Sequence, residues 1–222
     1  MTTSDPLAPF EWLAAPESEG VLGSIFTIAC VRGLTPAETA LRFSRGTDAG
    51  QTLDFAALDE RAWAFASDGG EGGGHVGVFQ TGEWCVVIEP TGWFCTLYEV
   101  LTRLSRGCEV VTATRHDYAE HSFAYAVDGA VVMGYNLMLP YERHGADPDR
   151  LNTQMRDLGM TLEKPADDAA WAAAWKENYG PAVTRGFALV SAVSGVPLTP
   201  DVLDRPMLVT PFVAPLKREV AE

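Results

Sequence analysis

Two short turn sequences constrain the fold of this 222-residue chain more than any other feature. Asp128-Gly129 separates two alternating apolar runs, and Gly82-Glu83 separates another pair. Dipeptides of this kind close two-residue β-hairpins, because glycine adopts the backbone angles that such turns require. The sequence therefore predicts an antiparallel sheet that contains at least two hairpins.

The runs around these turns predict the strands and their register. In the first hairpin, Thr81 is expected opposite Trp84 and Phe79 opposite Val86, so that alternate residues share a face. The predicted strands are 22–31, 75–81, 84–89, 109–116, 121–127 and 130–139. The segment 209–213 is compatible with an edge strand, because it contains a proline. Both faces of the later strands are apolar, which indicates a sheet covered on both sides, or covered on one and used on the other.

Helices are predicted between and after these strands. Thr35–Glu38 and Thr96–Glu99 both have the pattern of a capping box at a helix start. Further helices are expected at 54–66, 148–158, 167–177 and 181–194, with a last short one from 199. The predicted fold is α+β, with an antiparallel sheet of about five or six strands, a hairpin plus a three-stranded meander, packed by helices. Residues 1–222 are expected to form a single domain, with the sheet in 1–140 and a mainly helical part in 141–222.

The chain is strongly acidic, with a net charge of −14. Residues 1–100 contain four arginines and no lysine against fourteen acidic residues, a net charge of −10. Nucleic acid and anionic membranes would be repelled, so neither is expected as a partner. An acidic first half could instead face a basic protein partner, although a high acid content also serves solubility alone.

A cytoplasmic location is predicted. The start of the chain has no basic segment followed by an apolar run, so we expect no secretory signal there. No apolar stretch approaches the roughly 20 residues that span a bilayer. The four cysteines are scattered, form no CxxC pair and lie mostly in apolar surroundings, which is typical of buried thiols in a reducing compartment.

His116 and His121 are the closest pair of chemically versatile side chains. If 117–120 forms a four-residue loop, the two imidazoles face each other across the mouth of the hairpin at about 5 Å. Asp117 and Glu120 lie between them, so a metal shell is conceivable. The spacing matches no recognised ligand pattern, and we favour a polar hairpin tip without metal.

Glu89 is the second candidate, because it ends an apolar strand and is followed by Gly92 and Trp93. A desolvated carboxylate beside an indole could act as a general acid or base. It could equally accept hydrogen bonds from the backbone of its own turn or of the helix near Thr96, and this structural role is favoured.

Other catalytic patterns are missing from the sequence. There is no G-x-S-x-G motif and no recognised Ser, Cys and His order. The glycine-rich segment 68–74 lacks the Lys-Ser/Thr ending of a phosphate-binding loop. We therefore predict no cofactor.

Six segments of the chain resemble an uncharacterised family of acidic actinobacterial proteins, a domain of unknown function common in streptomycetes. They are CVRGLTPAE at 30–38, WCVVIEPTGW at 84–93, LTRLSRG at 101–107, FAYAVDG at 123–129, HGADPDRL at 144–151 and SGVPLTPDVL at 194–203. The family's E-x-x-G-W pattern corresponds to Glu89, Gly92 and Trp93, whereas His116 and His121 lie outside it. The resemblance implies one unit over nearly the whole chain and no established activity.

Two hypotheses about function follow. The favoured one is an acidic, non-enzymatic interaction protein, a regulator or immunity-type partner that masks a basic protein surface. The alternative is a small-molecule-binding protein or enzyme with a pocket between the sheet and the C-terminal helices. Glu89, Trp93, His116 and His121 are the residues expected to line that pocket.

Overall fold

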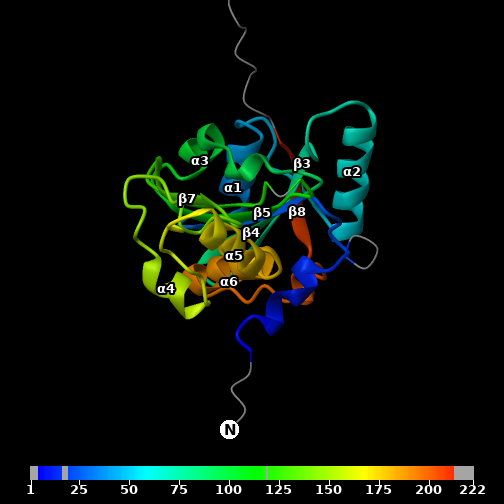
Figure 1. Ribbon diagram of the computed structural model, residues 1–222. Helices are drawn as coiled ribbons and strands as arrows, with labels where there is room; N and C mark the ends of the chain where they lie inside the picture. The colour runs from blue at the N-terminus through cyan, green and yellow to red at the C-terminus, as the bar shows by residue number, and fades with distance from the viewer. Residues whose placement is uncertain (1–4, 17–19, 119, 213–222) are drawn as a thin grey trace, which may run out of the picture.

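One antiparallel sheet of eight strands forms the centre of the molecule, in the order β2-β8-β3-β4-β1-β5-β6-β7 (Figure 1). The computed structural model describes residues 5–16, 20–118 and 120–212. The strands are β1 (Phe26–Arg32), β2 (Gln51–Leu53), β3 (His75–Thr81), β4 (Trp84–Pro90), β5 (Glu109–Arg115), β6 (Ser122–Val127), β7 (Ala130–Asn136) and β8 (Met207–Pro211). The α+β class and the antiparallel pairing are confirmed, but the prediction of five or six strands was too low.

The structure differs from the predicted sheet at one side, where β2 and β8 lie. β2 has three residues and no apolar alternation, so its sequence carried no indication of a strand. β8 pairs with β2 on one side and with β3 on the other, which makes it an interior strand rather than the predicted edge. Its proline is tolerated because Pro211 is the last residue of the strand, opposite His75.

Both predicted hairpins are present. Thr81 pairs with Trp84 and Phe79 with Val86, the register expected from the sequence. Gly82 has a φ of 59°, and at the second turn Asp128 and Gly129 have φ values of 48° and 79°. Two consecutive positive φ angles define a type I′ turn, whose twist matches that of the flanking strands.

Most helices begin and end close to the predicted positions, but the helix predicted at 148–158 starts only at Asn152, and the one predicted from 199 is a 3-10 helix. They are α1 (Pro36–Phe43), α2 (Phe55–Ser67), α3 (Tyr98–Leu104), α4 (Asn152–Asp157), α5 (Asp168–Tyr179) and α6 (Ala182–Ser194). Short 3-10 helices are η1 (Ala8–Ala14), η2 (Phe94–Thr96) and η3 (Pro200–Val202).

One of the two predicted capping boxes is correct. At α1, the Thr35 hydroxyl accepts from the Glu38 N–H at 3.3 Å, and the Glu38 carboxylate accepts from the Thr35 N–H at 2.8 Å. At α3 the prediction was wrong. The helix starts after Leu97, and the Thr96 hydroxyl donates to the carbonyl of Trp93 at 2.8 Å instead.

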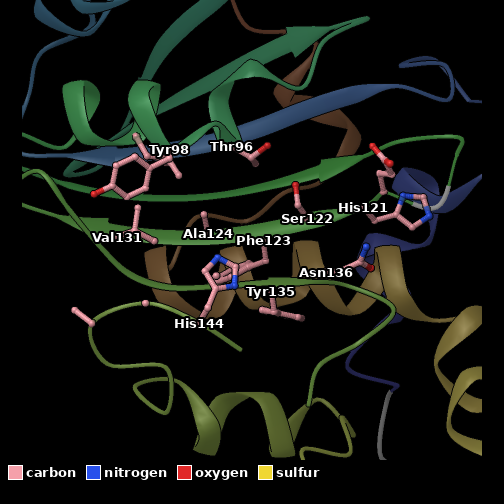
Figure 2. A pocket seen from close by; sticks show the side chains of 15 residues that line it. Thr96, Tyr98, His121, Ser122, Phe123, Ala124, Val131, Tyr135, Asn136 and His144 are labelled. Carbon is pink, nitrogen blue, oxygen red and sulfur yellow. The ribbon is translucent and has the colours of Figure 1, made fainter. Parts of the chain in front are cut away.

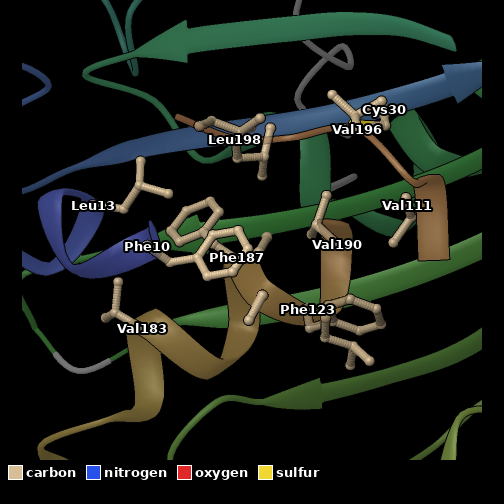
Figure 3. Close-up of a cluster of buried hydrophobic side chains, with 14 of the residues drawn as sticks. Phe10, Leu13, Cys30, Val111, Phe123, Val183, Phe187, Val190, Val196 and Leu198 are labelled. Carbon is tan, nitrogen blue, oxygen red and sulfur yellow. The ribbon is translucent and has the colours of Figure 1, made fainter. Parts of the chain in front are cut away.

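Helices cover both faces of the sheet, so each face has its own core. Figure 1 shows α1 and α3 on one side and α5 and α6 on the other. On the α6 side, Phe26 of β1 stacks on Phe187 at 5.4 Å, and η1 adds Phe10 and Leu13 (Figure 3). On the α3 side, Phe43 of α1 and Leu101 and Leu104 of α3 pack over strands β1, β4 and β5.

A loop covers the outer edge of β7. Gly134 and His144 exchange backbone hydrogen bonds of 2.8 and 2.9 Å, and the N–H groups of Ala146 and Asp147 donate to Val131 and Val132. The segment 144–147 therefore pairs with backbone groups that an open edge strand would leave free. This loop also forms one wall of the cavity described next.

Candidate functional site

A cavity of about 440 Å³ lies over strands β6 and β7, on the face of the sheet that carries α3 (Figure 2). Its floor is formed by small residues on neighbouring strands. Ala124 and Gly134 are directly opposite each other in the register, and Val131 lies further along β7. Because Ala124 has a short side chain, the space above it is left open, and the absence of a side chain on Gly134 makes room for the imidazole of His144.

Two walls rise from this floor on opposite sides. One is made by Tyr98 and Leu101 of α3 together with Thr96 of η2. The other is the loop that starts at His144, whose imidazole packs on Gly134 so closely that a Cβ there would lie 2.8 Å from Nε2. Tyr98 is 68% exposed at the rim, so the cavity opens to solvent on the α3 side.

Polar side chains close one end of the cavity. His121, Ser122 and Asn136 lie there, with Ser122 and Asn136 paired across β6 and β7 (Figure 2). The Nδ1 of His121 accepts a hydrogen bond of 2.9 Å from the backbone N–H of His116. A neutral imidazole that accepts at Nδ1 carries its proton on Nε2, so His121 offers a hydrogen-bond donor at Nε2.

His121 remains neutral at physiological pH. Burial lowers its pKa to about 4, and the positive charge of Arg115 acts in the same direction. Among the described residues none accepts a hydrogen bond from Nε2 of His121. The donor is therefore fixed in its tautomer and has no acceptor among the described residues at the cavity end.

The electrostatic character of the cavity is close to neutral. Glu120 is the acidic group among the described lining residues, and none of those residues is a lysine or arginine. Hydroxyl, amide and imidazole groups surround an apolar floor, which is the composition of a site for a small polar molecule with an apolar part.

This cavity lies in a different place from the pocket that was predicted from the sequence. The space between the sheet and the C-terminal helix α6 is occupied by buried side chains, among them Phe123, Phe187 and Leu189. Gly186 of α6 approaches so closely that a Cβ there would lie 2.6 Å from a methyl carbon of Leu137. The pocket predicted between the sheet and the C-terminal helices is therefore not formed at α6, where that space is core.

Glu89 lies away from the cavity and holds a turn together. Its side chain is 1% exposed, and its two carboxylate oxygens accept from the N–H groups of Phe94 and Cys95 at 3.0 Å each. Burial raises the pKa of Glu89, against the opposing effect of these hydrogen bonds. The carboxylate thus caps η2, the structural alternative that the sequence favoured.

Gly92 and Trp93 belong to the same turn. A Cβ on Gly92 would lie 2.3 Å from Oε1 of Glu89, so only glycine admits the carboxylate at this distance. The carbonyl of Gly92 accepts from the hydroxyl of Thr27 at 2.9 Å. The indole of Trp93 packs edge-on against His116 at 5.3 Å.

His116 and His121 do not face each other ring to ring. The His116 imidazole packs between Trp93 and Tyr118, and His121 hydrogen-bonds to the His116 backbone. Of the five residues proposed from the sequence, His121 lines the cavity. Glu89, Gly92 and Trp93 belong to the turn after β4, and His116 packs on that turn through Trp93. Among the described residues, no three His, Cys, Asp or Glu side chains are grouped to hold a metal ion.

Sequence reasoning missed most of the lining. Ala124, Gly134, Asn136 and His144 were not singled out as site residues. The alternation of small residues along one face of β6 and β7 was visible, but it also fits a close-packed helix. His144 joins the site through a bridge to β7, and nothing in the sequence around His144 specifies that pairing.

The fold and the cavity define an α+β protein with a doubly covered antiparallel sheet and a pocket over its outer strands. Residues 3–215 match a family model described as a family of unknown function, DUF6461, and the chain belongs to that family. No curated protein and no solved structure matched the chain. In the described part of the chain, none of the helices has the length and apolarity needed to cross a bilayer.

Proposed function

We propose that this protein binds an uncharged polar small molecule in the cavity over β6 and β7. The observation that carries the proposal is the open space of about 440 Å³ above the paired residues Ala124 and Gly134. A volume of this order holds a small organic ligand. The fixed Nε2–H donor of His121 beside Ser122 and Asn136 would orient it.

An uncharged ligand is favoured by the lining. Enclosing a charged group without an opposite charge carries a large desolvation penalty. The described lining offers no cationic side chain for an anion, and Glu120 is exposed at the rim. Neutral donors and acceptors around an apolar floor suit a nucleoside, sugar or amide better than a phosphate or carboxylate.

The test is to fill the cavity without changing its chemistry. Ala124→Met extends a side chain over the floor, and Ala130→Met makes the same change at an exposed position outside the cavity. Neutral nucleosides, sugars and amides are screened against both variants and the wild type by ligand-observed NMR. We expect compounds that bind wild type and Ala130→Met but not Ala124→Met. Equal binding to Ala124→Met, or binding of charged compounds alone, would contradict the proposal.

A second function, that of an interaction protein for a basic partner, is favoured by the surface of α2. This helix carries acidic residues and two exposed aromatics, Trp63 at 59% and Phe65 at 38% exposure. Exposed aromatic side chains are enriched at binding surfaces, and the neighbouring carboxylates would favour a basic partner. Capture of a basic protein that weakens steeply between 0.05 and 0.5 M NaCl supports this function, and capture indifferent to salt argues against it.

We place both functions in the cytoplasm of an actinobacterium. Cys30, Cys85, Cys95 and Cys108 are all buried and unpaired, as expected in a reducing compartment. The acidic surface supports neither a nucleic acid nor a membrane as partner.

A further inference from the structure

A second cavity, of about 460 Å³, lies beside α2. Its wall on one side is the helix itself, with Asp59 and Trp63. The backbone of residues 20–25 forms another side, and Thr91 and Asp117 come from the turn after β4 and from the tip of the β5–β6 hairpin. These segments are far apart in sequence, so the cavity is a product of the tertiary fold.

The charge of this cavity is uniformly negative. Among the described residues that line it, Asp59 and Asp117 are charged, and none is a lysine or arginine. Asp117 lies 3.6 Å from Nδ1 of His116, whereas Asp59 forms no hydrogen bond or ion pair with any described residue. Partial burial raises the pKa of the Asp59 carboxyl. A half-buried carboxylate without a counter-charge is unfavourable unless something else supplies that charge.

An indole lies on the same side of the helix as this carboxylate. Asp59 and Trp63 are four residues apart on α2, so their side chains are neighbours on one face. Trp63 is 59% exposed, and Val21 across the cavity is 65% exposed. The face of an indole attracts cations, and a carboxylate next to it strengthens the attraction.

We propose that the α2 cavity binds an organic cation, an ammonium or guanidinium group on an apolar stem. The charged head would lie between Asp59 and the indole of Trp63, and the stem would pack against Val21 and Leu22. The chemistry is shared by a free amine and by a lysine or arginine side chain on a partner protein. Binding of a lysine or arginine side chain from a partner protein rests on the second proposed function.

The binding test uses two cations and a neutral isostere. Nα-acetyl-lysine amide and n-butylamine are titrated into the full-length protein, with the indole N–H resonance of Trp63 followed by NMR. Nα,Nε-diacetyl-lysine amide keeps the stem of the first compound but has no charge. We expect saturable shifts with the two cations and none with the diacetyl compound.

Variants of α2 assign the site. Asp59→Asn removes the charge with the same shape, and Trp63→Leu removes the aromatic face from an exposed position. Glu60→Gln is the matched control, because it makes the same charge change on the same helix outside the cavity. We expect Asp59→Asn to weaken lysine amide binding about tenfold and Trp63→Leu about threefold, with Glu60→Gln unchanged. Because Trp63→Leu lacks the indole resonance, its binding is measured by calorimetry.

Each outcome decides between alternatives. Equal weakening by Asp59→Asn and Glu60→Gln means that charge acts at long range, and it overturns the cavity site. Equal binding of the neutral diacetyl compound also overturns it. A Gly-Lys-Gly-Lys-Gly peptide that binds more tightly than n-butylamine supports a protein source, and equal affinity supports a free amine. If a basic protein binds but ignores Asp59→Asn, the interaction function stands and the cavity site fails.

Discussion

The buried carboxylate of Glu89 connects strand β4 to η2. Its two oxygens are matched to two backbone N–H groups, those of Phe94 and Cys95. In Glu89→Gln one oxygen becomes an NH₂ group that cannot accept, so one buried N–H loses its partner. We expect a loss of about 1–3 kcal/mol in the free energy of unfolding, measured by urea denaturation.

A surface glutamate provides the comparison for this variant. Glu99 is exposed in the first turn of α3, so Glu99→Gln should change stability by less than about 0.5 kcal/mol. Similar losses in both variants would show that the Glu89 cap contributes little. Gly92→Ala is not expected to restore the stability lost in Glu89→Gln, because a Cβ at position 92 would meet the side chain of residue 89.

His121 is predicted to make the protein less stable in mild acid. Burial lowers its pKa from 6.5 to about 4, so between these values the unfolded chain binds a proton that the folded chain does not. The contribution of His121 to stability is therefore complete above pH 6.5 and is lost as pH falls toward 4. His121→Asn keeps an oxygen acceptor for the His116 N–H but does not titrate.

Urea unfolding at pH 7, 5.5 and 4.5 measures this difference. The wild type should lose more stability over this range than His121→Asn does. His75, whose pKa is also lowered by burial, remains in both proteins and so cancels in the comparison. Equal pH slopes for the two proteins would contradict the assignment to His121.

Among the elements, α6 depends on a glycine for its contact with the chain beyond β7. A Cβ on Gly186 would lie 2.6 and 2.8 Å from the two methyl carbons of Leu137, which is itself 4% exposed and cannot move aside freely. Glycine in a helix interior is ordinarily inferior to alanine. At Gly186 we expect the clash to reverse that preference, so that Gly186→Ala destabilises by about 1–3 kcal/mol.

Gly180, between α5 and α6, is the matched position for this substitution. Its φ is −63°, and a Cβ there meets nothing within 4 Å. Gly180→Ala should therefore stabilise the protein by about 0.4–1 kcal/mol through the unfolded chain. A lower thermal midpoint for Gly186→Ala and a higher one for Gly180→Ala would support close packing of α6. A higher thermal midpoint for both variants would refute it.

Local patterns explain why most elements could be predicted. The Asp128-Gly129 turn and the Thr35–Glu38 box are complete within a few residues, and both were correct. The box expected at Thr96 failed because Thr96 is the last residue of η2, and its hydroxyl donates to the carbonyl of Trp93 instead of capping α3. β2 was missed because three residues form a strand only where β8 is already present beside them.

The site was harder to predict than the fold, because no single element contains it. His121 was identified from its residue type, but its donor is fixed by the backbone of His116. The floor depends on the register that sets Ala124 opposite Gly134, and one wall depends on a loop that returns to β7 through His144. Only long-range contacts combine these parts, and a single sequence does not specify them.

At the scale of the whole molecule, the net charge of −14 should make stability depend on salt. Like charges repel in the compact state, and salt screens them, since the Debye length falls from about 30 Å at 0.01 M to about 10 Å at 0.1 M. The ion pairs found among the described residues are mostly exposed, as with Arg32 and Glu83, so screening them removes little stability. We expect the thermal midpoint at pH 7 to rise by roughly 2–6 °C between 0.01 and 0.3 M NaCl.

The isoelectric point supplies the control for this prediction. Near pH 4.6 the net charge is close to zero, so the repulsion that salt relieves at pH 7 is largely gone. The same NaCl series at pH 4.6 should then change the midpoint little. If salt raised it equally at both pH values, a general salting-out effect would explain the result, and repulsion between acidic groups would not. A salt effect confined to pH 7 would mean that an acidic surface is kept at a measurable cost in stability, which is what a surface selected to meet a cation would require.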